Sequence, residues 1–68
     1  MYKIKEEEIK KYKKYGLVRK VSQKTGVTEG YISQILNGRK TDISKVIAYA
    51  ITKAISNDLE IENLFDIM

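Results

Sequence analysis

Apolar residues along this 68-residue chain recur at intervals of three and four, which is the spacing of one face of an α-helix. The longest such series runs through Ile43, Val46, Ile47, Ala50, Ile51 and Ala54. No segment of useful length alternates apolar and polar residues as a half-buried β-strand does. The pattern therefore predicts an all-α fold, a compact bundle of five short helices.

Capping residues and glycines give the bounds of these helices. We expect helices at about 4–16, 18–25, 28–36, 42–54 and 59–68. Three helix ends are marked by residues that accept the left-handed conformation: Gly16, Gly26 and the pair Asn37-Gly38. Thr28 is a suitable N-cap for the third helix, and Thr41 or Asp42 for the fourth.

The composition limits what such a domain can do. Residues 1–68 make one small domain without cysteine or histidine, which excludes disulfides and the usual zinc clusters, so we expect no metal and no cofactor. No apolar run approaches the ~20 residues of a membrane span, and the first residues lack a signal-peptide core. We therefore expect a cytoplasmic protein that contacts no membrane.

The chain is too short to enclose a pocket and lacks a phosphate-cradling glycine loop, so we expect neither an enzyme nor a small-molecule ligand.

Charge is distributed unevenly along the chain, whose formal net charge is +4. Residues 9–25 contain no acid and seven bases: Lys10, Lys11, Lys13, Lys14, Arg19, Lys20 and Lys24. Residues 54–68 contain no base and four acids: Asp58, Glu60, Glu62 and Asp66. A basic surface with a pI near 9.4 suits the phosphates of nucleic acid. The alternative is that both are ordinary solvated faces.

Residues 18–37 combine the features of a helix-turn-helix, two helices joined by a tight glycine turn. Gly26 can supply the positive φ of the turn. Ser22 is the small residue where the helices touch, and we expect its hydroxyl to bond back to its own helix. Apolar residues stand where they can fix the crossing of the helices: Val21, Val27, Ile32 and Ile35.

The segment VRKVSQKTGVTEGYISQILNGRK resembles the helix-turn-helix of the phage repressor and Cro family, whose domains are lambda-repressor-like. The resemblance covers about 9–65, including the exit ILNGRKT and the segment LEIENLF, which is similar to the family's closing fifth helix. Two positions depart from the family pattern. Ser22 replaces an alanine, and Val18 replaces a glutamine that often contacts phosphate.

The resemblance implies that the third helix, about 28–36, is a recognition helix in the major groove of DNA. The implied base-reading residues are Thr28, Glu29, Gly30, Ser33 and Gln34. The implied phosphate contacts come from Arg19, Tyr31, Asn37, Arg39 and Lys40. Gln34 can pair with adenine, and Glu29 can accept from cytosine. Packing against the fourth helix is the alternative for Tyr31, and a tolerated surface glycine is the alternative for Gly30.

The resemblance further implies a transcriptional regulator, of phage or prophage type, on a double-stranded DNA operator. We expect it to be a homodimer at least on DNA, because one such domain contacts few bases. The apolar stripe near the C-terminus either fills the core or also serves the dimer: Ile61, Leu64, Phe65 and Met68. An antirepressor or antitoxin-like module that binds another regulatory protein or a toxin is the alternative. Four features favour that alternative: Glu29, Gly30, Val18 and the acidic tail. Carboxylates repel phosphate, and Val18 lacks the glutamine's phosphate contact.

Overall fold

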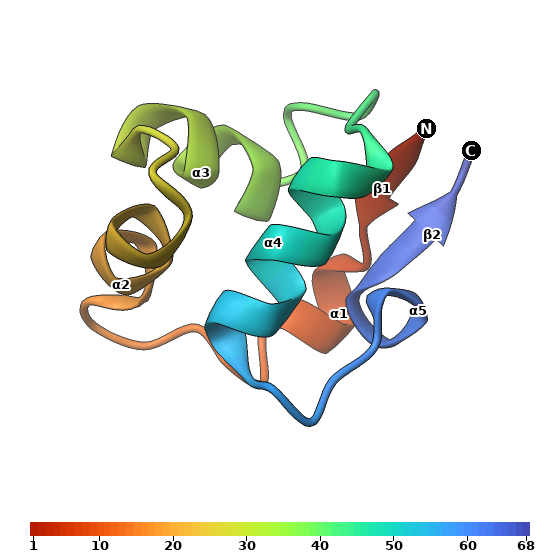
Figure 1. Ribbon diagram of the computed structural model, residues 1–68. Coiled ribbons are helices and arrows are strands. Elements are labelled where there is room, and N and C mark those ends of the chain that lie inside the picture. Colours follow the sequence, from red (N-terminus) through yellow and green to blue (C-terminus); the bar gives the residue numbers. More distant parts are fainter.

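The computed structural model describes residues 1–68 as five helices and two short strands (Figure 1). The order is β1 (Tyr2–Ile4), α1 (Glu6–Ile9), α2 (Leu17–Thr25), α3 (Glu29–Leu36), α4 (Lys45–Ile55), α5 (Ile61–Leu64) and β2 (Phe65–Ile67). The expectation of a compact, largely helical fold with five helices is confirmed. The expectation of a purely helical fold is wrong, because the two ends of the chain form a small sheet.

This sheet joins residues from the two chain ends. β1 and β2 are antiparallel, with Tyr2 opposite Ile67, Lys3 opposite Asp66 and Ile4 opposite Phe65. On its other side β1 meets Ile43, where the Tyr2 N–H donates to the Ile43 carbonyl at 2.7 Å and the Ile43 N–H returns a bond at 3.0 Å. Ile4 and Phe65 are buried, so one face of the sheet closes the core.

The first helix is much shorter than the 4–16 expected. Ile4 belongs to β1, and α1 is a single turn over Glu6–Ile9. The residues that follow include four lysines within five positions, whose like charges at helical spacing repel, and Tyr12 is their one residue that packs against the core. Gly16, expected to end this helix, instead precedes α2 with a left-handed φ of +87°.

The fourth helix begins later than expected. Ser44 is its N-cap, accepting from the Ile47 N–H at 3.3 Å, in place of Thr41 or Asp42. Ile43 pairs with Tyr2 beside the sheet and lies before α4. The side of α4 that is buried therefore differs from the side that the apolar spacing predicted. Val46, expected in the core, is 76% exposed as a result.

The fifth helix is also a single turn, since the chain becomes extended from Phe65 onward. The Asn63 side chain accepts from the Glu60 N–H at 2.8 Å and so fixes the start of α5. Leu64 and Phe65 fill the core, whereas Ile61 is half-buried and Met68 is exposed. The expected stripe therefore divides between the interior and the surface.

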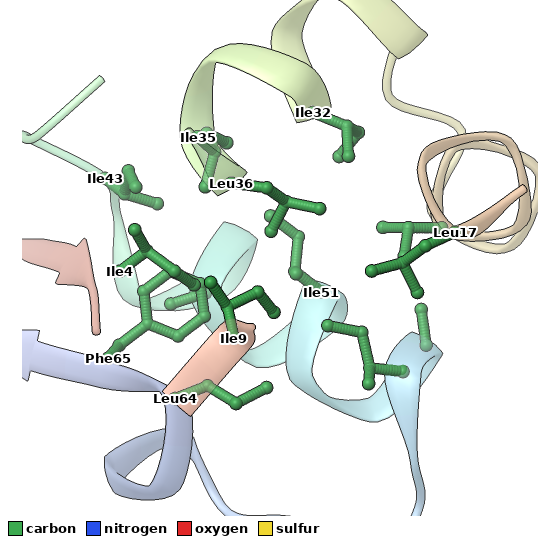
Figure 2. Packing of buried hydrophobic residues seen from close by; sticks show 14 residues of the cluster. Ile4, Ile9, Leu17, Ile32, Ile35, Leu36, Ile43, Ile51, Leu64 and Phe65 are labelled. Atoms are coloured by element: carbon green, nitrogen blue, oxygen red, sulfur yellow. The ribbon is translucent and has the colours of Figure 1, made fainter. Parts of the chain in front are cut away.

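One hydrophobic core connects all of these elements (Figure 2). It consists of fourteen buried residues: Ile4, Ile9, Leu17, Val21, Ile32, Ile35, Leu36, Ile43, Ala48, Ile51, Ala54, Ile55, Leu64 and Phe65. Thr52 is the buried polar residue, and its hydroxyl donates to the Ala48 carbonyl at 2.8 Å. The core lies behind α3, and this fixes which side of α3 faces solvent.

Candidate nucleic-acid interface

The connection between α2 and α3 is held by hydroxyl groups of α2. Gly26 ends α2 with a φ of +79°, as expected, and its N–H donates to the Ser22 carbonyl at 2.9 Å. The Thr25 hydroxyl donates to the Val21 carbonyl at 2.8 Å and accepts from the Val27 N–H at 3.2 Å. The Ser22 hydroxyl donates across the turn to the Val27 carbonyl at 2.6 Å. The expectation that this hydroxyl bonds back to its own helix is therefore wrong.

Both ends of α3 are also fixed by local hydrogen bonds. Thr28 is its N-cap, as expected, and its hydroxyl accepts from the Tyr31 N–H at 3.3 Å. At the other end Gly38 is left-handed, with φ +78°, and the Arg39 N–H returns to the Gln34 carbonyl at 2.9 Å. Figure 1 shows α2 and α3 running in clearly different directions on one side of the molecule.

The outer side of α3 carries a stripe of polar residues, here called the α3 stripe: Glu29, Gly30, Ser33, Gln34 and Asn37. Their spacing places them on one face, because positions three to four apart are neighbours on a helix. Gly30 is exposed, and a Cβ added to it meets no atom within 4 Å. Gln34 is exposed and its side chain has no hydrogen bond within the protein. The structure thus brings four of the five expected base-reading residues onto one open face, while the Thr28 hydroxyl serves as a cap.

A groove runs beside the α3 stripe. It consists of two adjoining hollows of about 320 and 200 Å³, which share Lys14, Leu17 and Val18. The residues 13–16 and the first turn of α2 form one wall, and Glu29, Ser33 and Asn37 of the stripe contribute the other. The N–H groups of Val18 and Arg19 have no partner, as at the start of any helix. This wall therefore presents positive charge and free donors.

Lys13 links the wall of the groove to the α3 stripe. Its ammonium group donates to the Asn37 side-chain oxygen at 3.1 Å, and the Asn37 amide donates to the Ser33 hydroxyl at 3.2 Å. Asn37 is therefore engaged within the protein. Lys13 and Lys14 were missing from the expected site, although the break of the helix that places them could have been suspected from the repulsion in this lysine run.

The expected phosphate-contacting residues divide into free and engaged groups. Arg19 and Arg39 are exposed, and their side chains form neither an ion pair nor a hydrogen bond. Lys40 lies 3.3 Å from Asp42, and this hydrogen bond holds the pKa of the Asp42 carboxyl below its ordinary value. Tyr31 is half-buried and packs against the core, so its side chain is less available to a phosphate than those of the two arginines.

Glu29 has a reason within the fold for being acidic. It occupies the first turn of α3, where the partial positive charge of the helix end favours a carboxylate. It also lines the larger hollow together with Lys14 and Arg19. Its charge is therefore partly balanced by the protein itself.

No three acidic side chains come together in a way that could hold a metal ion. None of the helices combines the length and the apolar character needed to cross a bilayer. Comparisons with protein-family models, with curated proteins and with solved structures find no match for this chain.

Proposed function

We propose that the chain is a sequence-specific DNA-binding transcriptional regulator of the Cro or repressor type. In this proposal α2 and α3 form a helix-turn-helix, and α3 is the recognition helix in the major groove. The similarity to the phage repressor and Cro family belongs to the same proposal. Such a protein acts in the cytoplasm on double-stranded DNA, as a homodimer at least when bound.

The α3 stripe is the observation that carries the proposal. It is a polar helix face with an open position at Gly30 and an unengaged amide at Gln34. Basic side chains flank it, with Lys14 and Arg19 along the groove and Arg39 beyond the C-terminal end of α3. A helix enters the major groove by its exposed face, and flanking bases hold it against the two phosphate backbones.

The residues then take two different roles. Gln34 reads a base edge, for which adenine is the natural partner of a glutamine side chain. Arg19, Arg39 and Lys14 contact phosphates, which position the protein without specifying sequence. The absence of a side chain at Gly30 lets the helix backbone approach the bases closely.

Binding measured at two salt concentrations, on the duplex of highest affinity, tests these roles. We expect Gln34→Ala to lose about 1–3 kcal/mol of discrimination at one base pair and to keep the parent salt dependence. We expect Arg39→Ala to weaken binding to all sequences and to lower the slope of log affinity against log salt by about 0.9.

Matched controls separate these effects from general ones. Lys45→Ala removes an exposed charge at the start of α4, and Asn57→Ala removes an exposed amide far from α3 along the chain. Both should bind DNA as the parent does. The proposal fails if Gln34→Ala leaves the base preference intact, or if Lys45→Ala changes the salt slope as much as Arg39→Ala does.

Glu29 favours a second candidate function, that of a protein-binding antirepressor or antitoxin-like module with the same fold. Its carboxylate stands on the α3 stripe, where it repels phosphate but can pair with a basic side chain of a protein. Glu29→Gln distinguishes the two. It should strengthen general DNA binding if the stripe meets DNA, and weaken capture of the protein partner if it meets a protein.

A further inference from the structure

The strand β2 has a free edge. β1 lies in the middle of the sheet, with β2 on one side and Ile43 on the other. Tyr2 is opposite Ile67 but exchanges its backbone bonds with Ile43, so the Ile67 N–H and carbonyl are not used by β1. The Met68 N–H, in contrast, donates to the Met1 carbonyl at 2.8 Å. Because backbone groups of an antiparallel strand alternate in direction, those of Ile67 point away from the sheet.

Most of the residues around this free edge are apolar. Ile67 is 77% exposed and Met68 63%. Beside Ile67 lies a hollow of about 180 Å³, to which Tyr2, Ile61 and Phe65 contribute together with the charged residues Lys45 and Glu62. Edge strands of soluble proteins usually carry a charge, a proline or a bulge at such a position. Here the residue that presents its backbone to solvent is an isoleucine.

The one charged residue of β2, Asp66, does not prevent another strand from pairing with the edge. Asp66 lies opposite Lys3 in the ladder, and its carboxylate is 3.9 Å from the Lys5 ammonium group. Lys3 of the neighbouring strand and Lys5, the residue directly after that strand, thus balance it. The two charged residues that line the hollow, Lys45 and Glu62, are of opposite sign, so another strand that approaches β2 meets no excess of one charge.

We infer that this edge is an interface between two copies of the chain. β2 pairs with β2 of the second copy in antiparallel orientation about a two-fold axis at Ile67. Each Ile67 N–H then donates to the carbonyl of the other, and the two isoleucine side chains meet beside the hollow. A strand paired antiparallel with itself satisfies two-fold symmetry directly, so a second copy fits this edge without any change in its sequence.

The choice of a second copy rests in one respect on the proposed function. Two recognition helices on half-sites one turn apart must be about 34–36 Å from each other. The domain measures 27 Å along its longest axis, so the two copies must join on sides remote from α3 to span that distance. Figure 1 shows β2 and the α2–α3 pair on opposite sides of the molecule.

Two measurements on the DNA-free protein test the interface. Sedimentation from dilute to concentrated solution should show a weak monomer–dimer equilibrium, with a dissociation constant on the order of 100 μM, since the contact is small. Amide hydrogen exchange should show protection at Ile67 that rises with protein concentration. The Asp66 amide lies within the existing ladder and should be equally protected at all concentrations.

A matched pair of variants locates the interface. Ile67→Glu places two like charges opposite each other and should raise the dissociation constant about tenfold or more. Val46→Glu makes the same change at an equally exposed residue, 76% against 77%, on α4, and should leave the constant within about twofold. Both side chains are outside the core, so the thermal midpoint of the dilute monomer should match that of the parent.

The inference is overturned if the parent remains monomeric at the highest concentration and the Ile67 amide stays unprotected. It is equally overturned if Val46→Glu dissociates the dimer and Ile67→Glu does not. Either result leaves DNA reading by α3 to be judged from Gln34→Ala and Arg39→Ala. Conversely, a dimer that responds to Ile67→Glu but shows no base preference contradicts the proposed function alone.

Discussion

The α2–α3 pair and the β1–β2 sheet lie on opposite sides of one small core and differ in how they are held and in what they expose. The connection of α2 to α3 is fixed by hydrogen bonds between residues at most five positions apart, such as that from Ser22 to Val27. The sheet is fixed by pairs such as Ile4 and Phe65 from the two chain ends. The outer face of α3 is polar and flanked by bases, while the edge of β2 is apolar.

Because of this difference we propose a different kind of partner for each of the two sides. A polar face with free cations suits a polyanion, and an apolar strand edge suits another strand. Phe65 connects the regions, because its side chain packs into the core that also seats α3. The stability of the α2–α3 pair should therefore depend on a residue of β2.

The largest expected effect comes from breaking that connection. Phe65→Ala should cost about 3–5 kcal/mol of unfolding free energy, which for so short a chain is comparable with the whole stability. Urea or thermal unfolding, followed by helical circular dichroism, measures the loss. Ile67→Ala on the same strand should cost less than about 0.5 kcal/mol, since its side chain is exposed. Equal midpoints for Phe65→Ala and the parent would mean that the sheet does not support the helices.

Two glycines of the α2–α3 pair should respond in opposite directions to alanine. Gly26→Ala should destabilise the fold by about 1–2 kcal/mol, because φ +79° is strained for a residue with a Cβ. Gly30→Ala should stabilise it by up to about 1 kcal/mol, because this glycine is helical and the added methyl meets open space.

Measuring both the unfolding free energy and the DNA affinity of each glycine variant distinguishes an effect on stability from an effect on DNA binding. We expect Gly30→Ala to bind DNA more weakly although it is more stable, since the added methyl group keeps the helix from the bases. Undiminished DNA binding by Gly30→Ala would make Gly30 an ordinary surface glycine.

The smallest expected effect concerns the ion pair of Lys40 and Asp42. Asp42→Asn frees Lys40 for a phosphate and should steepen the salt dependence of DNA binding by about 0.9 in slope. The lowered pKa of Asp42 means that the parent pair persists to pH values below the ordinary carboxyl range. Asp58→Asn makes the same change of charge in the turn after α4. If Asp58→Asn steepens the slope equally, the effect is one of net charge and not of Lys40.

Residues 17–36 were largely predictable because their signals are local. Gly26 and Thr28 mark the ends of the two helices, and the apolar positions between them repeat at helical spacing. The sheet left no such signal, because Ile4 meets Phe65 across most of the chain, and neither strand is long enough to show alternation. The burial of Val46 was wrongly predicted for a related reason. Ile43, the first residue of the same apolar series, pairs with Tyr2 of β1 and does not belong to the helix.

In the candidate site, too, the features with local signals were predicted and those that depend on distant contacts were not. The α3 stripe was predicted because one helix carries it, so its spacing could be deduced from the sequence alone. Lys13 and Lys14 were not predicted, because they come beside α3 only through the turn that ends α1 early. Nothing in the local sequence fixed the direction of that turn.

Selection of duplexes from a random DNA library by the parent protein tests the central claim most directly. The account predicts enrichment of a two-fold symmetric motif whose half-site centres are about 10–10.5 base pairs apart, as expected for two α3 helices in successive major grooves. Retention of duplexes without any enriched sequence, at a salt concentration that still allows binding, would contradict reading of DNA by α3.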